Sequence, residues 1–263
     1  MMMKGKKVLV VGVANKSSIA WGITEALLRE GAQVALTYQN ERLEGRVREL
    51  ADSVEPKLPC YEMDASQPAS VAAVFEKLTA DWGSLDGLVH SIAFAPKDDL
   101  TPGIVKTSLE SWNTAIHISA YTLLELVRAA MPLFEKAGGG SVITLTYDTS
   151  KVYPNYNLMG VAKTTLEAAM RYAAWDAGRK NVRVNAVSAG PMKTLAARGI
   201  SGFTSMLDTG AKKSPMGRNV TPEEVGNTGL FLLSPMASGI TGQILYVDAG
   251  QSIVGVAVGE STP

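Results

Sequence analysis

Residues 8–38, VLVVGVANKSSIAWGITEALLREGAQVALTY, contain a strand, a helix and a second strand in immediate succession. VLVVGV (8–13) is a short continuous apolar run, which is typical of a strand buried on both faces. The amphipathic segment from Ser18 to Glu30 predicts a helix that ends at Gly31, and QVALTY (33–38) predicts the next strand. A helix that connects two parallel strands is the repeating unit of an α/β fold.

The same alternation continues along the chain. Further strands are predicted at 58–63, 87–94, 141–146, 182–188 and 244–250, and helices from about Arg42, from Pro68 to Trp82, from Leu109 to Lys136 and from Tyr156 to Ala177. Continuous apolar strands between helices indicate a parallel sheet covered on both faces, and right-handed crossovers make that sheet doubly wound. We therefore expect a Rossmann-type α/β fold with seven strands.

Residues 1–263 are expected to form one domain, because the chain shows no repeat, no linker and no break in composition. The segment 190–220 differs from the rest, since it is rich in Gly, Ser, Thr and Pro and has no strong period. A long irregular loop in a compact domain is usually functional, so we expect a substrate-binding lid there.

Composition narrows the class of protein. Apolar residues make up 46% of the chain and charged residues 19%, which favours a large core over disorder. Lys+Arg and Asp+Glu are equal at 25 each, so charge gives no argument for a nucleic-acid partner. Cys60 is the only cysteine, which excludes an internal disulfide and a cysteine metal cluster. With no signal-like or membrane-spanning stretch, we expect a cytoplasmic protein without a membrane partner.

The loop after the first strand is a candidate dinucleotide site, because doubly wound sheets bind ligands beyond the carboxyl ends of their strands. GVANKSSIAWG (12–22) lacks the G-x-G-x-x-G pattern. Gly12 can make the tight turn, while Ser18 and Ile19 stand where glycines would be expected. Ser18 is predicted to cap the helix and to offer its hydroxyl where a pyrophosphate would bind. The alternative is a plain strand-to-helix turn.

The second strand ends in TYQNER (37–42), where a cofactor ribose would find its partner. Gln39 can bond ribose hydroxyls but brings no charge to a 2′-phosphate, so NADH is favoured. NADPH is the alternative, with Arg42 or Arg46 as phosphate partners, although arginines on a charged helix are usually solvated.

Two further strand ends are assigned to the cofactor. Asp64 closes the third strand, where its carboxylate can accept from an adenine amino group, or else cap the helix before Pro68. Ala65 is assigned with it. Small residues end the fourth strand and allow close approach of a cofactor to the backbone; they are Ser91, Ile92 and Ala93.

The motifs become specific when taken together. GVANxxSIAxGI, TYQNERL, HSIAFAP, YPNYNLMGVAK, VNAVSAGPMKTLAARGI and GITGQILYVDAG occur in this order over nearly the whole chain. The sequence resembles the bacterial enoyl-[acyl-carrier-protein] reductases, a divergent branch of the short-chain dehydrogenase/reductases. The resemblance implies a homotetramer that uses NADH or NADPH to reduce trans-2-enoyl thioesters in fatty-acid biosynthesis.

The resemblance also implies roles for residues by position. Tyr147 and Tyr156 match the two active-site tyrosines of the family, and Ala95 lies where the acyl substrate passes. The family's cofactor contacts correspond to Gly12, Ser18, Ile19, Gln39, Asp64, Ile92, Lys163, Met192 and Thr194. The two tyrosines stand one residue closer together than in the family pattern, which leaves the role of Tyr147 less defined than that of Tyr156.

The spacing of tyrosine and lysine distinguishes two chemistries. Reductases of carbonyl groups carry Tyr-x-x-x-Lys on a helix, where the lysine lowers the phenol pKa. Aligned on Lys163, that tyrosine would be residue 159, which is Met159, so we assign Met159 to the substrate site. Tyr156 precedes Lys163 by seven residues, roughly 10 Å along a helix. It can donate to the enolate oxygen of a reduced enoyl thioester while Lys163 holds the cofactor ribose.

Tyr147 and Lys151 also match Tyr-x-x-x-Lys, but Pro154 follows too soon for a helix there. Lys151 is expected to be solvated, and His90 and His117 to be structural. Arg198, Lys212 and Lys213, in or beside the lid, are open to contact with an acidic carrier protein or to simple solvation. Two alternatives to the enoyl reductase remain: a carbonyl reductase or alcohol dehydrogenase, and a non-catalytic NAD-binding sensor.

Overall fold

The computed structural model describes residues 1–96, 100, 103–194 and 203–255. Seven parallel strands form one sheet in the order β3-β2-β1-β4-β5-β6-β7. Chain order reverses between β1 and β4, as expected for a doubly wound sheet. The strands are β1 Lys7–Val11, β2 Gln33–Tyr38, β3 Cys60–Glu62, β4 Gly87–His90, β5 Gly140–Thr146, β6 Val182–Ala189 and β7 Ile244–Val247. The predicted Rossmann-type α/β fold is confirmed.

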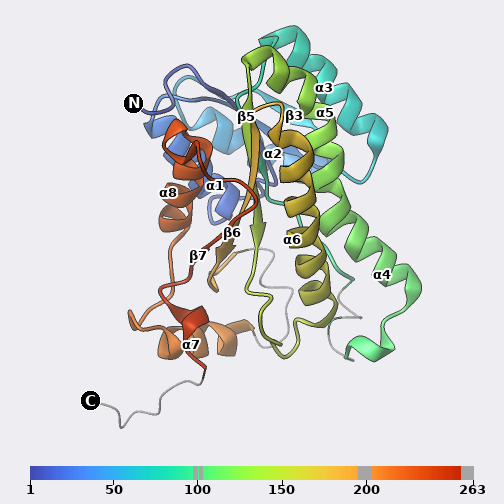
Figure 1. Ribbon diagram of the computed structural model, residues 1–263, viewed down its shortest axis with the longest axis vertical. Coiled ribbons are helices and arrows are strands. Elements are labelled where there is room, and N and C mark those ends of the chain that lie inside the picture. Colours follow the sequence, from blue (N-terminus) through green and yellow to red (C-terminus); the bar gives the residue numbers. More distant parts are fainter. Residues whose placement is uncertain (97–99, 101–102, 195–202, 256–263) are drawn as a thin grey trace.

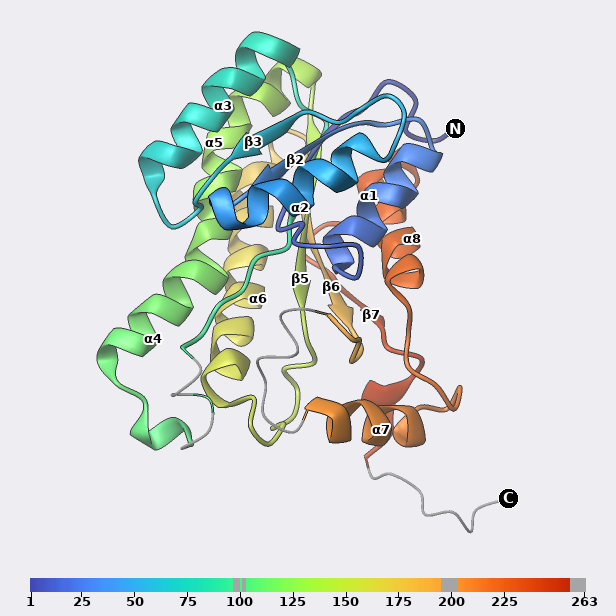
Figure 2. The ribbon, with the colours of Figure 1, turned by 180° about the vertical axis from the view of Figure 1, so that it is seen from behind.

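Helices cover both faces of the sheet (Figures 1 and 2). One face carries α1 (Ile19–Arg29), α2 (Glu41–Asp52) and α8 (Pro222–Leu233); the other carries α3 (Pro68–Trp82), α5 (Thr122–Ala137) and α6 (Asn157–Gly178), with α4 (Leu109–Ile116) beyond them. Side chains of β1 alternate between two cores, Val8 and Val10 on one side and Leu9 and Val11 on the other. A strand buried on both faces is therefore apolar throughout.

The predicted helix over 109–136 is interrupted. A π-helical turn, His117–Tyr121, separates α4 from α5. Its buried Ser119 accepts a hydrogen bond from the Phe94 N–H at 2.9 Å and donates to the Phe94 carbonyl at 3.0 Å. This explains why β4 ends at His90 and not at residue 94, because the backbone of Phe94 bonds to the π turn instead of a neighbouring strand. The other strand and helix boundaries differ from prediction by a few residues.

The segment 190–220 is not wholly irregular, which corrects the prediction. Phe203–Lys213 forms α7, although residues 195–202 lie outside the described part of the chain. Helix α8 was not predicted, yet its signal was present: Thr221 and Glu224 form a capping box and Pro222 occupies the first turn. Short 3-10 turns lie at Ile104–Lys106, Pro235–Ala237 and Gln251–Ile253.

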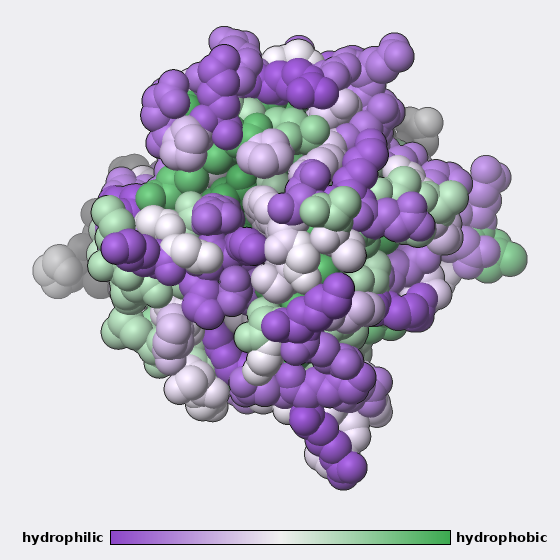
Figure 3. All heavy atoms as spheres, turned by 90° about the horizontal axis from the view of Figure 1, so that it is seen from above, coloured by the Kyte–Doolittle hydropathy of each residue, from purple (hydrophilic) through white to green (hydrophobic). Residues whose placement is uncertain are grey.

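The strands run toward α7 (Figure 1). The opposite end, seen in Figure 3, is mostly covered by hydrophilic side chains around a smaller hydrophobic area. No helix of the described residues has the length and apolar character needed to span a membrane.

Glycines allow α1 and α8 to touch through their backbones. A Cβ on Gly226 would lie 2.3 Å from the carbonyl oxygen of Gly22, and one on Gly22 would lie 2.4 Å from that of Pro222. A side chain at either glycine would therefore force the two helices apart. Overpacking of this kind costs about 1–3 kcal/mol. Gly45, in the exposed middle of α2, would meet nothing within 4 Å.

We predict that Gly226→Ala destabilises the protein by about 1–3 kcal/mol. The matched variant Gly45→Ala should stabilise it by about 0.4–1 kcal/mol, because alanine restricts the unfolded chain without a native clash. Urea denaturation followed by circular dichroism compares the two. Equal effects of the two substitutions would show that the close helix contact does not constrain stability.

Candidate active site

A cleft of about 770 Å³ lies at the carboxyl ends of the strands and spans the point where strand order reverses. It draws its lining from β1, β2, β4, β5 and the segments that follow them. Of the predicted site residues, the cleft is lined by Gly12, Ile19, Gln39, Asp64, Ala65, Ser91, Ile92, Ala93, Ala95, Tyr147, Tyr156, Met159, Lys163, Met192 and Thr194. The structure thus brings together residues separated by more than 180 positions.

Gly12 fixes the shape of the cleft at its centre. Its φ is +106°, and a Cβ there would lie 2.0 Å from the carbonyl oxygen of Ser91. Only glycine permits the loop after β1 to lie directly against the end of β4. The groove left beside this contact, next to the N-terminus of α1, suits the backbone approach of a dinucleotide phosphate.

Ser18 takes only part of the predicted role in the helix cap. It occupies the N-cap position of α1, but its side chain makes no capping hydrogen bond and does not line the cleft. Its hydroxyl donates to the carbonyl oxygen of Asn15 at 2.6 Å, while the Asn15 side chain accepts from the Ser17 N–H at 2.9 Å. The loop is therefore closed by local bonds that engage the hydroxyl.

The ends of β2 and β3 line the other arm of the cleft. Gln39 and Arg42 are exposed there, whereas Arg46 is not part of the lining. The Asp64 carboxylate accepts from the Ser66 N–H at 3.0 Å and from its hydroxyl at 2.7 Å. Gln67 is the N-cap of α3, so the alternative role of Asp64 as the helix cap is wrong.

Lys163 is the buried cation of the cleft. Its Nζ donates to the Leu145 carbonyl at 2.7 Å, which fastens α6 to the end of β5. Burial lowers the lysine pKa to about 8, and the Glu167 carboxylate acts in the opposite direction.

His90 lies in the neighbouring strand β4. Its two ring nitrogens lie 2.7 Å from the Thr144 hydroxyl and 2.9 Å from the Thr122 hydroxyl. Burial lowers its pKa to about 3, with the Lys163 charge adding to the effect, so this histidine is neutral and structural.

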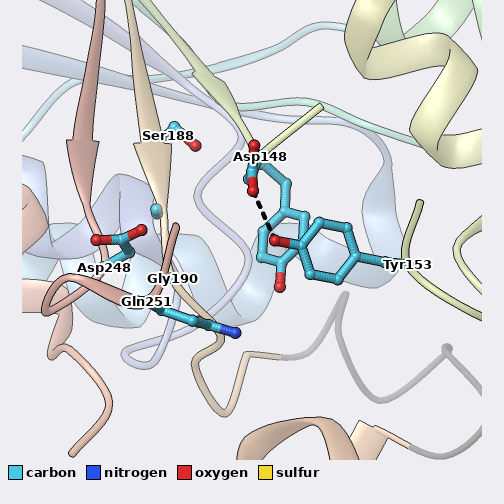
Figure 4. Close-up of a pocket in the computed structure, with 8 residues that line it drawn as sticks. Asp148, Tyr153, Ser188, Gly190, Asp248 and Gln251 are labelled. Carbon is cyan, nitrogen blue, oxygen red and sulfur yellow. Dashed lines mark hydrogen bonds between the residues drawn. The ribbon is translucent and has the colours of Figure 1, made fainter. Parts of the chain in front are cut away.

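Three tyrosines cluster where β5 leaves the sheet. The Tyr147 ring contacts Tyr156 at a centroid distance of 5.3 Å and Tyr153 at 4.8 Å. Tyr153 does not line the cleft. Its hydroxyl donates to the Asp148 carboxylate at 2.6 Å (Figure 4). Burial raises the pKa of Tyr156 and of Tyr147, so both phenols are protonated at neutral pH. Tyr156 faces the cleft with a phenol that can donate a proton to a hydrogen bond but resists losing it.

Tyr147 also borders a second, smaller cavity of about 10 Å³, the size of one water molecule. Asp248, Gln251 and Ser188 line it with Asp148 and Tyr153 (Figure 4). The Tyr147 hydroxyl is buried, and the Gln251 amide approaches it without reaching hydrogen-bonding geometry. Tyr147 therefore contacts the cleft on one side and the C-terminal segment on the other.

Lys151 is not part of the cleft. It is exposed and not fully solvated, because its ammonium donates to the Ser252 carbonyl and lies 3.7 Å from the Asp148 carboxylate. These partners hold its ammonium outside the cleft. Residues 147–151 do not form a helix, as predicted, so the Tyr-x-x-x-Lys match there lacks the helical spacing.

Sequence reasoning missed much of the apolar lining. Leu100, Ile118 and Met206 come from segments that are distant along the chain. Each is an ordinary apolar residue with no motif around it, so only the folded arrangement identifies it. The other lining residues that were not predicted are Val11, Val13, Ala14, Thr37, Leu43, Met63, Ser66, Phe94, Leu145, Thr146, Ala189, Gly190 and Pro191.

Comparison with known proteins agrees with this geometry. The enoyl-[acyl-carrier-protein] reductase [NADH] of Rickettsia felis is 45% identical over 255 residues, which cover 97% of each chain. The reductase of Anaplasma phagocytophilum, solved in complex with NAD, is 45% identical with a TM-score of 0.93 over 98% of each chain. The Bacillus cereus reductase, solved with NADP+ and an indole naphthyridinone, is 43% identical with a TM-score of 0.94 over 97% of this chain and 99% of that one.

The family model for the enoyl-(acyl carrier protein) reductases matches residues 12–252. That range includes both tyrosines, Lys163 and the strand ends that form the cleft. This chain belongs to the enoyl-(acyl carrier protein) reductase family.

Proposed function

We propose that this protein reduces the C2=C3 bond of trans-2-enoyl thioesters carried on acyl carrier protein, with NADH as reductant, in fatty-acid biosynthesis. One observation carries the proposal: Tyr156 and Lys163 share the cleft while Met159 occupies the position of a carbonyl-reductase tyrosine. A methionine cannot exchange a proton with an alcohol, which argues against the carbonyl reductase. The pair of functional side chains argues against a silent NAD sensor.

The cleft fits a dinucleotide, because the Gly12 contact leaves backbone accessible at the strand reversal. Gln39 and Asp64 would hold the adenosine half, and Ile92 and Lys163 the nicotinamide half. Bound there, NADH supplies the hydride that adds to the β-carbon of the enoyl group. Thr194 and Met192 would close over it from the segment after β6.

Tyr156 acts as the donor to the thioester oxygen in this proposal. As hydride arrives, negative charge develops on that oxygen and needs a preorganised hydrogen bond. Within the described residues the Tyr156 hydroxyl has no hydrogen-bond partner, and its raised pKa keeps it protonated. Ala95 and Met159 would line the acyl path, and Tyr147 supports the Tyr156 ring.

The single-domain organisation and the lid at 190–220 stay predictions. They are supported by α7, because Met206 on that helix lines the cleft. Helix α7 is anchored just beyond its end by the Ser214 hydroxyl, which donates to the Ala249 carbonyl at 2.6 Å. Arg198, one of the residues considered for carrier-protein contact, lies outside the described residues.

A homotetramer is supported by large apolar side chains left exposed on α4, the π turn and α6. Tyr172 and Trp175 on α6 are 75% and 77% exposed, and Leu109 on α4 is 75% exposed. Trp112 on α4 and Tyr121 in the π turn are also exposed, and α4 packs against α6. Exposed large apolar side chains on neighbouring elements are typical of an interface, and a second copy of the chain is the proposed partner.

NADH should give a higher kcat/KM than NADPH, because Gln39 brings no positive charge to a 2′-phosphate. Any turnover with NADPH should depend on Arg42, which lines the cleft beside Gln39. Initial rates with each nucleotide, for wild type and for Arg42→Ala, measure this. Arg46→Ala is the matched control and should change neither rate. Equal or better turnover with NADPH would contradict the prediction.

Lys163→Ala should raise the Kd of NADH about 10- to 100-fold, the cost of losing a hydrogen bond from a charged group. Tyr156→Phe should leave that Kd nearly unchanged and lower kcat about 10- to 100-fold, because its bond strengthens only as charge develops. Fluorescence titration of NADH and rates with crotonyl and longer enoyl thioesters give the two quantities. Lys151→Ala is the control and should change neither quantity. If Lys151→Ala loses turnover while Lys163→Ala binds NADH and reduces normally, the assignment of Tyr156 and Lys163 is wrong.

The double substitution of Tyr172 and Trp175 to glutamate should break the tetramer into smaller species, because it places charge on the proposed interface. Light scattering after size exclusion measures the mass. Lys77→Glu, on the exposed side of α3, should leave the assembly intact. A wild-type protein that elutes as a monomer would exclude the interface.

A further inference from the structure

Glu167 is a buried carboxylate on α6, one helical turn beyond Lys163. It is 5% exposed, and both of its oxygens are used. Oε1 accepts from the Thr146 hydroxyl and Oε2 from the Thr149 hydroxyl, each at 2.7 Å. Hydrogen bonds to a charged acceptor are about twice as strong as neutral ones, so Glu167 ties α6 firmly to the segment after β5.

Lys163 and Glu167 hold the same short segment. Lys163 bonds to the carbonyl of Leu145, and Glu167 bonds to the hydroxyls of Thr146 and Thr149. Tyr147, whose ring packs against Tyr156, lies between the two threonines. A change at Glu167 is therefore transmitted to the tyrosine pair through the backbone between Thr146 and Thr149.

The charge of Glu167 also bears on Lys163. His90 faces the lysine from β4 but is neutral, and the Tyr147 and Tyr156 phenols are protonated. Elements packed against α6 carry other titratable groups: Glu110 on α4, His117 and Tyr121 in the π turn, Glu125, Arg128, Glu135 and Lys136 on α5, and Arg183 on β6. Among the described residues, Glu167 is the one whose charge favours the Lys163 ammonium.

We propose that Glu167 is a positioning residue of the reductase, which fixes the Tyr147 segment and preserves the ammonium of Lys163 for the cofactor ribose. This inference rests on the proposed function. Glu167 does not line the cleft, so it acts through the residues that it holds.

The sign of the pH effect follows from Lys163. If NADH binding uses the ammonium, the affinity for NADH is highest below the lysine pKa and falls as the pH rises through that pKa. That pKa is about 8 with Glu167 present. Removing the carboxylate lowers it further, so the alkaline weakening should begin at lower pH. A unit charge one helical turn away, about 6 Å, accounts for a move of about one pH unit.

The test measures the Kd of NADH by fluorescence between pH 6 and 9.5, together with kcat for crotonyl thioester. Glu167→Gln should move the alkaline midpoint of NADH binding down by about one unit and lower kcat. Thr149→Val keeps the charge but removes one anchor, so it should lower kcat and leave the midpoint in place. Glu125→Gln, an equally buried glutamate on α5, should change neither.

An unmoved midpoint in Glu167→Gln, or an equal shift in Glu125→Gln, would overturn the proposal. If Glu167→Gln does not fold, Glu167→Asp replaces it: it keeps the charge at shorter reach, so it should keep the midpoint and lose kcat. A shifted midpoint in Glu167→Asp would then contradict the assignment. A wild-type protein without reductase activity would reject the proposed function, whereas the NADH titrations would still test the link between Glu167 and Lys163.

Discussion

The contact between Gly12 and Ser91 is the constraint on which the site depends. It brings the loop after β1 against the end of β4 at the one place where the strand order reverses. Any side chain at position 12 would force these backbones apart, and the groove beside them would change shape. The missing glycines of the usual dinucleotide motif matter less, because Asn15 and Ser18 fold the rest of the loop through local bonds.

Burial sets the chemistry of the cleft through two opposite effects. Desolvation disfavours charge, so it lowers the pKa of Lys163 and raises that of Tyr156. A carbonyl reductase needs a phenol that exchanges its proton readily, with an adjacent ammonium to lower its pKa. Here the phenol stays protonated and precedes the lysine by seven residues, which suits a hydrogen-bond donor for a developing enolate.

The sequence predicted the sheet because its central strands, such as β1, are largely apolar and buried on both sides. It also predicted most of the cleft, since ends of parallel strands converge and residues such as Gln39 and Asp64 follow them directly. The π turn at His117–Tyr121 was not predicted, because one residue inserted into the helical hydrogen-bond pattern leaves no mark in composition. Helix α8 was not predicted despite the capping box at Thr221. The Ser18 hydroxyl makes no capping bond because local bonding to Asn15 competes with it.

Residues without a motif show why the site could not be completed from sequence. Ile118 in the π turn lines the cleft, and Ser119 in the same turn fixes the backbone of Phe94, another lining residue. The register of a helix more than twenty residues away thus sets the position of the loop after β4. The hydrophobic pattern of a sequence indicates which face of a helix is buried, but it does not indicate which loop that face contacts.

The same reasoning applies to Lys151, whose partners at Asp148 and Ser252 come from the end of β5 and the C-terminal segment. A motif defined by spacing along one segment says nothing about a competing partner a hundred residues away, and here that partner decides that Lys151 is structural.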